Sequence, residues 1–306
     1  MSHSLEKIMA SARQVSRAYR IEQGRNFRLK QISPGDTGGG VKNVVDIQWQ
    51  AKTFLEFANA RLTELQEKLY AQKHWSLLIV LQAMDAAGKD GTIKHVMSGI
   101  NPQGCEVTSF KVPSGAELTH TFLWRCAQRV PGSGMIGIFN RSHYEDVLAP
   151  RIHPEFLQAH NLPPPLVTKN IWQERYEDIN AFEQHLARNG VLILKFYLHV
   201  SKEEQKRRLL ERINEKNKNW KFSEADLRER ALWDRYMEAY EEAIRATAKP
   251  WAPWYVVPAD NKWFTRAIVA VTVIDALEAL YLKRPKVSGE IKKALLAARR
   301  SLKDEG

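Results

Sequence analysis

Apolar and polar positions alternate along this chain in a pattern that predicts an α/β fold. We predict strands at residues 76–82, 106–110, 135–139, 191–200 and 254–257, and most of these are short apolar runs of the kind that is typical of strands buried on both faces. Stretches with helical spacing of apolar residues lie between them, at 92–98, 116–129, 143–149, 176–189 and 261–282. Because strands that alternate with helices build parallel sheets, we predict a parallel sheet sandwiched by helices.

The same pattern suggests how the chain is organised. Residues 1–48 are interpreted as an N-terminal extension, and residues 49–285 as the main domain, which opens with an amphipathic helix over about 49–70. The alternation breaks at about 201–248, where two helices joined by a polar turn are inserted between strands. We interpret this insertion as a lid over the site. Residues 286–306 form a basic C-terminal tail.

The segment after the first strand has the composition of a phosphate-binding loop. Such loops follow the pattern G-x-x-x-x-G-K-[ST], with backbone N–H groups and a lysine around the phosphates. Here Ala83 replaces the first glycine and Asp90 replaces the Ser or Thr, so the match is partial. Lys89 would bind phosphate and Asp85 would ligate a metal or orient the acceptor. The candidate phosphate-binding positions around them are Ala86, Ala87, Gly88, Asp90, Gly91 and Thr92. The alternative is a structural turn with a solvated Lys89 and with Asp85 as a helix N-cap.

A second polar cluster follows the strand at 135–139. Asn140 stands where a nucleotide kinase carries its Walker-B-type carboxylate, and Arg141 has the forked shape that clamps phosphate. Glu145 lies on the helix that follows. Since ligands of parallel sheets bind outside the carboxyl ends of the strands, we expect this cluster and the first loop to form one site. The alternative role of Arg141 is an ordinary ion pair with Glu145 or Asp146.

Composition narrows the class of partner. The 306 residues have a formal net charge of +11 and a pI near 9.5, which favours anionic partners. No apolar run approaches the roughly 18 residues of a membrane span, and the first twenty residues lack the apolar core of a secretory signal. Cys105 and Cys126 have no metal-site spacing, which is typical of reduced thiols in a cytoplasmic protein. We therefore expect a cytoplasmic location and no membrane partner.

Five segments together resemble the second family of polyphosphate kinases, in order between about residues 27 and 282. They are Gln82–Gly91, Thr108–Pro113, Phe139–Asp146, Ser201–Leu210 with Trp220–Phe222, and Ala252–Asp260. The resemblance implies a P-loop kinase-like α/β fold with a helical lid. It also implies reversible phosphoryl transfer between inorganic polyphosphate and nucleotides, with Mg²⁺ or Mn²⁺ as cofactor, and a homo-oligomer, either a dimer or a tetramer.

The resemblance also assigns residues. The family's loop aspartate and lysine fall on Asp85 and Lys89, and its Walker-B-type position and following arginine fall on Asn140 and Arg141. The basic positions of the lid fall on Arg207, Arg208, Arg212, Lys218 and Lys221. We place Lys111 beside them along the polyphosphate groove. Some members carry Asp at the position of Asn140, so Asp85 takes the larger share of metal binding here.

Two alternatives to a polyphosphate-dependent kinase of ADP or AMP, or of guanine nucleotides, stay open at the level of sequence. One is an ATP-dependent nucleoside or nucleotide kinase. The other is a nucleic-acid-binding protein with an incidental loop, although no helix-turn-helix, zinc-finger or RNA-recognition signature is present and we expect no nucleic-acid partner. The lid arginines also have an alternative, a solvated helix face paired with Glu203, Glu204 and Glu211.

Overall fold

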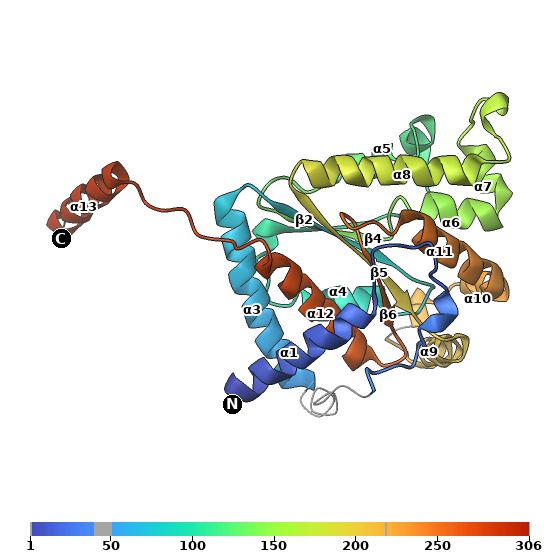
Figure 1. Cartoon of the computed structure of the whole chain (residues 1–306), viewed down its shortest axis with the longest axis horizontal. Coiled ribbons are helices and arrows are strands. Elements are labelled where there is room, and N and C mark those ends of the chain that lie inside the picture. Colours follow the sequence, from blue (N-terminus) through green and yellow to red (C-terminus); the bar gives the residue numbers. More distant parts are fainter. Residues whose placement is uncertain (1, 40–50, 218, 306) are drawn as a thin grey trace.

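A computed structural model describes residues 2–39, 51–217 and 219–305 (Figure 1). Within these residues the chain forms a six-stranded sheet in the order β1-β6-β5-β2-β4-β3. The strands span Arg20–Ile21 (β1), Ser76–Gln82 (β2), Cys105–Ser109 (β3), Ile136–Asn140 (β4), Val191–His199 (β5) and Trp254–Pro258 (β6). Neighbouring strands are parallel except for β1, which pairs antiparallel with β6. The predicted α/β fold with a parallel sheet between helices is confirmed.

Helices cover both faces of this sheet (Figure 1). One layer contains α1 (Ser2–Ala18), α3 (Ala51–Gln72), α4 (Lys89–Val96) and α12 (Lys262–Glu278). The other contains α6 (Glu145–Ile152), α8 (Ile171–Arg188) and α11 (Trp233–Thr247). The segment expected to be a lid of two helices, at about 201–248, forms α9 (Lys202–Asn214), the 3₁₀ turn η5 (Asn219–Lys221) and α10 (Glu224–Ala231), and its last part is α11, which packs against α6 and α8 in this second layer. Shorter elements are η1 (Leu29–Gln31), η2 (Pro102–Gly104), η3 (Gly115–Thr119), α5 (Trp124–Ala127), α7 (Pro154–Ala159) and η4 (Pro164–Leu166).

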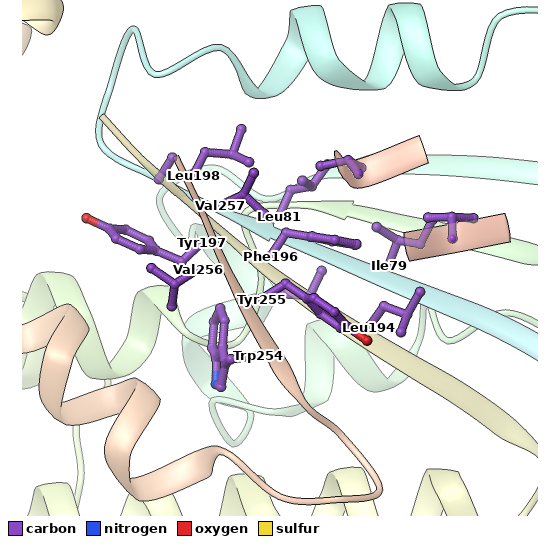
Figure 2. Close-up of a cluster of buried hydrophobic side chains, with 14 of the residues drawn as sticks. Ile79, Leu81, Leu194, Phe196, Tyr197, Leu198, Trp254, Tyr255, Val256 and Val257 are labelled. Carbon is purple, nitrogen blue, oxygen red and sulfur yellow. The ribbon is translucent and has the colours of Figure 1, made fainter. Parts of the chain in front are cut away.

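The core lies on the three central strands. Figure 2 shows side chains of β2, β5 and β6 packed together, among them Phe196, Trp254 and Val256, which are 1% exposed or less. Every residue of β2 is buried. A strand covered on both faces has no solvent side, which is why these strands are continuous apolar runs rather than alternating ones. The core therefore fixes the strand ends on which the site is built.

The register of the sheet brings two loops together. Leu81, near the end of β2, lies opposite Asn140, the last residue of β4. The amide of Arg141 continues this pairing and donates to the carbonyl oxygen of Leu81 at 3.0 Å. The loop after β2 and the loop after β4 therefore leave the same edge of the sheet as neighbours, as expected from their positions after parallel strands.

Several helix boundaries differ from the expectation: α8 begins five residues earlier than predicted, α12 ends four residues earlier, and two further differences have a clear physical reason. Residues 116–129 are not one helix, but the 3₁₀ turn η3 and the single helical turn α5, separated by a non-helical segment. Thr119, His120 and Thr121 are weak helix formers, and the buried Arg125 is held by tertiary hydrogen bonds to Lys111 and Asp146. Helix α4 begins at Lys89, three residues earlier than predicted, because Gly88 adopts the left-handed conformation at its N-cap.

The described part of residues 1–48 packs into the same core as the main domain. Helix α1 lies against α12 and α3, and its Ile8, Met9 and Ala12 are 2% exposed or less. Strand β1 adds to the edge of the sheet, a pairing too short to leave a signal in the apolar pattern. Residues 40–50, which include the expected domain boundary and the first residues of the expected helix at 49–70, lie outside the described residues.

The C-terminal tail forms helix α13 (Gly289–Asp304), which stands apart from the rest of the chain (Figure 1). Its residues are exposed, including Ile291, Leu295 and Leu302. No helix among the described residues combines the length and the apolar content needed to cross a bilayer.

Candidate active site

The loop between β2 and α4 has two residues in the left-handed backbone conformation, and only one of them is a glycine. Ala86 and Gly88 both have positive φ angles, of 62° and 110°. Gly88 adopts this conformation without a Cβ penalty, whereas Ala86 adopts it at a cost. The first turn of α4 follows immediately, so its amide groups, which lack carbonyl partners within the helix, are available for an anion. Residues 85–92 all line one cavity of about 850 Å³.

Lys89 is buried at the start of α4. Its side chain is 9% exposed, and Nζ donates to the carbonyl oxygen of Ala83 at 2.9 Å. Burial lowers the pKa of this ammonium group, and the nearby Arg141 lowers it further. The structural alternative is therefore wrong on both points. Lys89 is buried rather than solvated, and the N-cap of α4 is Gly88 rather than Asp85. An anion in the cavity would compensate the charge of Lys89.

Arg141 lies at the start of the neighbouring loop and pairs with the first one. Its Nη2 is 2.8 Å from Oδ1 of Asp85, whereas the alternative had placed the ion pair with Glu145 or Asp146. Arg141 also has a positive φ of 64°. The carboxylate of Glu145 is the main cause that raises the pKa of Arg141, and burial raises the pKa of Glu145 itself. The two loops therefore meet through a charged pair, and Glu145 stands beside it.

A buried network fixes the segment that follows Arg141. Lys195 on β5 is fully buried, and its Nζ donates to Glu183 Oε2 at 2.6 Å and to the Tyr144 hydroxyl at 2.9 Å. The Tyr144 hydroxyl in turn donates to Glu183 Oε1 at 2.8 Å. Tyr144 lies three residues after Arg141, so this network anchors the arginine loop to β5 and α8. Such anchoring holds the guanidinium group in position.

The donors around Asp85 fit a divalent cation that keeps most of its water. No group of three or more His, Cys, Asp or Glu side chains within the described ranges could hold a metal by itself. Asp85 nevertheless presents a carboxylate to the cavity, and the buried Oδ1 of Asn140 has no hydrogen-bond partner among the described residues. The Asn140 Nδ2 donates to Asp90 Oδ1 at 2.9 Å. Hard oxygen donors of this kind, completed by water and phosphate oxygens, match the divalent metal requirement that kinase chemistry implies.

The lid arginines have three different environments. Arg207 is exposed and paired with Glu204 and Glu211, and it does not line the cavity. Arg208 is buried and donates to the carbonyl oxygens of Ala86, Ala87, Ala259 and Asp260, so it holds the phosphate loop and the β6–α12 connection together. Arg212 lines the cavity and pairs with Asp226 of α10 at 2.9 Å.

The remaining lysines that the sequence singled out are placed as follows. Lys111 is exposed and lines the cavity. Lys218 and the side chain of Lys221 lie outside the described residues.

A second cavity, of about 360 Å³, adjoins the first. Asp85, Arg141 and Lys111 line both cavities. Phe110 is shared as well, and beyond the shared residues the second cavity has mainly apolar and aromatic walls, including Phe156, Tyr236 and Tyr240. The ion pair of Asp85 and Arg141 therefore stands where the two cavities meet.

Two cations of the first cavity were missed by the sequence interpretation. Lys262 and Arg266, from the first two turns of α12, line it together with Lys89. The signal that could have found them is their position, because they follow β6 at the same edge of the sheet that carries both loops.

These features define a P-loop kinase-like phosphotransferase: a strand in the middle of a parallel sheet leads into a Gly-Lys loop, and a basic loop and a helical lid face it. A family model described as "Polyphosphate kinase 2 (PPK2)" matches residues 48–285. The chain belongs to this family, as its motifs indicated.

Similar proteins agree with this assignment. The "ADP-polyphosphate phosphotransferase" of Rhodopseudomonas palustris is 51% identical over 243 residues, which cover 79% of this chain and 84% of that protein. The "AMP/ADP-polyphosphate phosphotransferase" of Meiothermus ruber is 46% identical over 271 residues, covering 88% and 95%. The crystal structure of Polyphosphate Kinase 2 from Arthrobacter aurescens TC1 has a TM-score of 0.83 and 41% identity, and the match covers 94% of this chain and 96% of that one.

Proposed function

We propose that this chain is a polyphosphate-dependent nucleotide kinase that transfers a phosphoryl group, reversibly, between inorganic polyphosphate and ADP, AMP or both. The observation that supports this most directly is the pair of cavities that meet at Asp85 and Arg141. One is rich in cations and suits a chain of phosphates, and the other has aromatic walls and suits a nucleotide. The names of the two relatives from Rhodopseudomonas palustris and Meiothermus ruber, which refer to ADP and to AMP/ADP, also support this proposal.

In this proposal the donor and acceptor phosphates meet at the ion pair. Lys89 and the amides of residues 88–91 bind the donor end, and Arg141 stabilises the charge that builds up on the transferring group. Asp85 would hold Mg²⁺, or Mn²⁺ in its place, and the ion would neutralise part of the phosphate charge. Positioning and electrostatics are sufficient here because phosphoryl transfer requires little covalent participation by the protein.

The choice of donor tests the proposal. The purified protein is incubated with polyphosphate, Mg²⁺ and either ADP or AMP, without ATP, and the nucleotide products are separated by chromatography. We expect ADP to yield ATP, or AMP to yield ADP, in at least one mixture. If no mixture yields product while ATP phosphorylates a nucleoside or nucleotide acceptor, the ATP-dependent kinase is the correct interpretation.

The same assay extends to further parts of the proposal. Guanine nucleotides replace adenine ones to test base preference, and Mn²⁺ replaces Mg²⁺. Light scattering after size-exclusion chromatography distinguishes a dimer or tetramer from a monomer. We keep the cytoplasmic location as a proposal, which is supported by Cys105 and Cys126 being free thiols.

A further inference from the structure

Helix α12 places two cations on the wall of the larger cavity. Lys262 and Arg266 are four residues apart, so their side chains lie on the same face of the helix. Both line the cavity that contains the phosphate loop, and neither lines the aromatic one. The start of α12 and the phosphate loop approach closely, since a Cβ atom added to Gly91 would lie 3.7 Å from Nη2 of Arg266.

These two cations differ from the lid arginines in having no ion-pair partner among the described residues, although Glu211 lines the same cavity. Among the described residues, neither Lys262 nor Arg266 makes a side-chain hydrogen bond or ion pair, whereas Arg207 is held by two glutamates. Burial lowers the pKa values of both Lys262 and Arg266, and the charge of Arg208 lowers them further. Arg208 is paired with Glu204, so Lys262 and Arg266 are the two cations of this wall that have no ion-pair partner among the described residues, an arrangement that an anion would stabilise.

The guanidinium of Arg208 is not available to a ligand in the same way. Its donors are directed to four backbone carbonyl oxygens and to Glu204, so its hydrogen-bonding capacity is used inside the protein. Arg208 contributes positive charge to this wall but no unused N–H group. The side-chain N–H groups of Lys262 and Arg266 have no hydrogen-bond acceptor among the described residues. Contact with an anion at this wall therefore falls to the two residues of α12.

The position of these residues indicates which part of a ligand they would meet. In the proposed function the reacting phosphates lie where the two cavities join, at Asp85 and Arg141, which line both cavities. Lys262 and Arg266 belong only to the cationic cavity, so they are reached by a ligand that extends past Lys89 and the loop. An inorganic polyphosphate has such an extension, with one negative charge on each internal phosphate, whereas the phosphates of a nucleotide end at the junction.

We propose that Lys262 and Arg266 form an outer subsite that binds internal phosphates of the polyphosphate donor, beyond those held by the loop. This inference rests on the proposed function. Arg266 supplies a planar fork that contacts phosphate through two N–H groups, and Lys262 supplies a compact charge. The subsite sets the affinity for long donors and takes no part in the transfer itself.

The test compares donors of two lengths in three variants. Lys262→Ala, Arg266→Ala and the double variant are assayed with tripolyphosphate and with long-chain polyphosphate of defined length, at saturating nucleotide. Each single variant should raise the KM for the long donor about tenfold, which corresponds to one charge-assisted hydrogen bond, and should raise the KM for tripolyphosphate less. The kcat at saturating long donor and the KM for nucleotide should stay unchanged. Arg266→Lys should recover part of the loss.

A matched control and a salt series make the result specific. Lys94→Ala removes an exposed cation of α4 that lines neither cavity, and should leave all constants within twofold. Raising the salt concentration should weaken long-donor binding less steeply in the double variant, because fewer phosphates are contacted. Thermal unfolding of each variant shows that the fold is retained.

The outcomes separate this inference from the function on which it rests. If the native protein uses no polyphosphate donor, the proposed function fails. If the native protein uses polyphosphate, equal losses with both donors, a raised KM for nucleotide, or no loss at all would each overturn the outer subsite. Calorimetric titration of long-chain polyphosphate without nucleotide repeats the comparison independently of turnover, and there too the double variant should bind at least tenfold more weakly.

Discussion

The two cavities that meet at Asp85 and Arg141 are built from different kinds of residue. In the larger one, cationic side chains outnumber acidic ones: Lys89, Lys111, Arg141, Arg208, Arg212, Lys262 and Arg266 against Asp85, Asp90, Glu211 and Asp226. In the smaller one the balance reverses, with Asp85, Glu145, Asp146, Asp226 and Glu229 against Lys111, Arg125 and Arg141. A ligand charged along its whole length suits the first. A ligand with charge at one end and an aromatic base at the other suits the second.

The difference shows how one enzyme can keep two phosphorylated substrates in their own places. Both substrates carry phosphate, so phosphate recognition alone could not sort them. The smaller cavity would repel a second polyanion beyond the shared residues, and it supplies aromatic walls of its own, Phe156, Tyr236 and Tyr240, for a base. Only the junction, with Arg141, needs to recognise both.

Removing Lys89 should have the largest effect on this arrangement. Lys89→Ala is expected to lower kcat/KM about a thousandfold, because the ammonium group stabilises phosphate charge in a buried position. Steady-state kinetics with polyphosphate and ADP measure the loss, and circular dichroism checks that the fold is intact. Turnover equal to the native protein's, together with weaker retention on DNA, would favour the nucleic-acid-binding alternative.

A substitution in the smaller cavity alone should weaken binding of the nucleotide acceptor and leave binding of the polyphosphate donor unchanged. Phe156 is 37% exposed on α7 and lines only that cavity. Phe156→Ala is expected to raise the KM for nucleotide about tenfold, since one aromatic contact with a base contributes roughly 1–3 kcal/mol, and to leave the KM for polyphosphate unchanged. Leu166→Ala is the control, because Leu166 is exposed and lines neither cavity. A raised polyphosphate KM would contradict the division of roles.

The pH dependence should also differ between the two substrates. The pKa of Lys89 is lowered from 10.5 by burial and by Arg141, while the carboxylates of Asp85, Glu145 and Asp90 act against this shift. A bound anion favours the ammonium form, so affinity for polyphosphate should fall several-fold as pH rises through the lowered pKa. The KM for nucleotide should change less over the same alkaline range. Lys89→Arg keeps its charge at high pH and should flatten the polyphosphate profile.

A substitution on the outer face of the lid should have the smallest effect on the kinetic constants. Arg207→Ala should change every kinetic constant by less than twofold, because Arg207 is exposed, paired with Glu204 and Glu211, and outside both cavities. Arg212→Ala, one turn further along α9, should raise the KM for polyphosphate several-fold, since Arg212 lines the larger cavity. Equal effects of the two substitutions would mean that both arginines reach the donor.

The comparison of Arg207 with Arg208 also shows what the sequence could not provide. Continuous apolar runs predicted β2 to the residue and β4, β5 and β6 to within one residue at each end, because burial on both faces dominates their composition. Neighbouring lid arginines have no such signature. Arg208 is distinguished only by the carbonyl groups that surround it, which belong to the phosphate loop and to the connection after β6.

Other features that the sequence did not predict were missed for the same reason, because they depend on contacts between distant parts of the chain. The short strand β1 and the broken helix at 116–129 depend on tertiary contacts rather than on local preference. Lys262 and Arg266 were overlooked because nothing in a basic helix start separates a solvated cation from one that faces a cavity. In contrast, the phosphate loop and Arg141 follow strands directly, so the order of strands along the chain was enough to bring them together.

The antiparallel strand β1 has a practical consequence for shortened versions of this protein. Without it, β6 would be the exposed margin of the sheet, and the amide of Val256 would lose the carbonyl oxygen of Tyr19, which it contacts at 2.9 Å. Tyr19 also covers Phe264, with ring centroids 5.9 Å apart. A truncated chain that starts at residue 48, where the family match begins, would leave an open strand available to other molecules and should precipitate more readily than the intact protein.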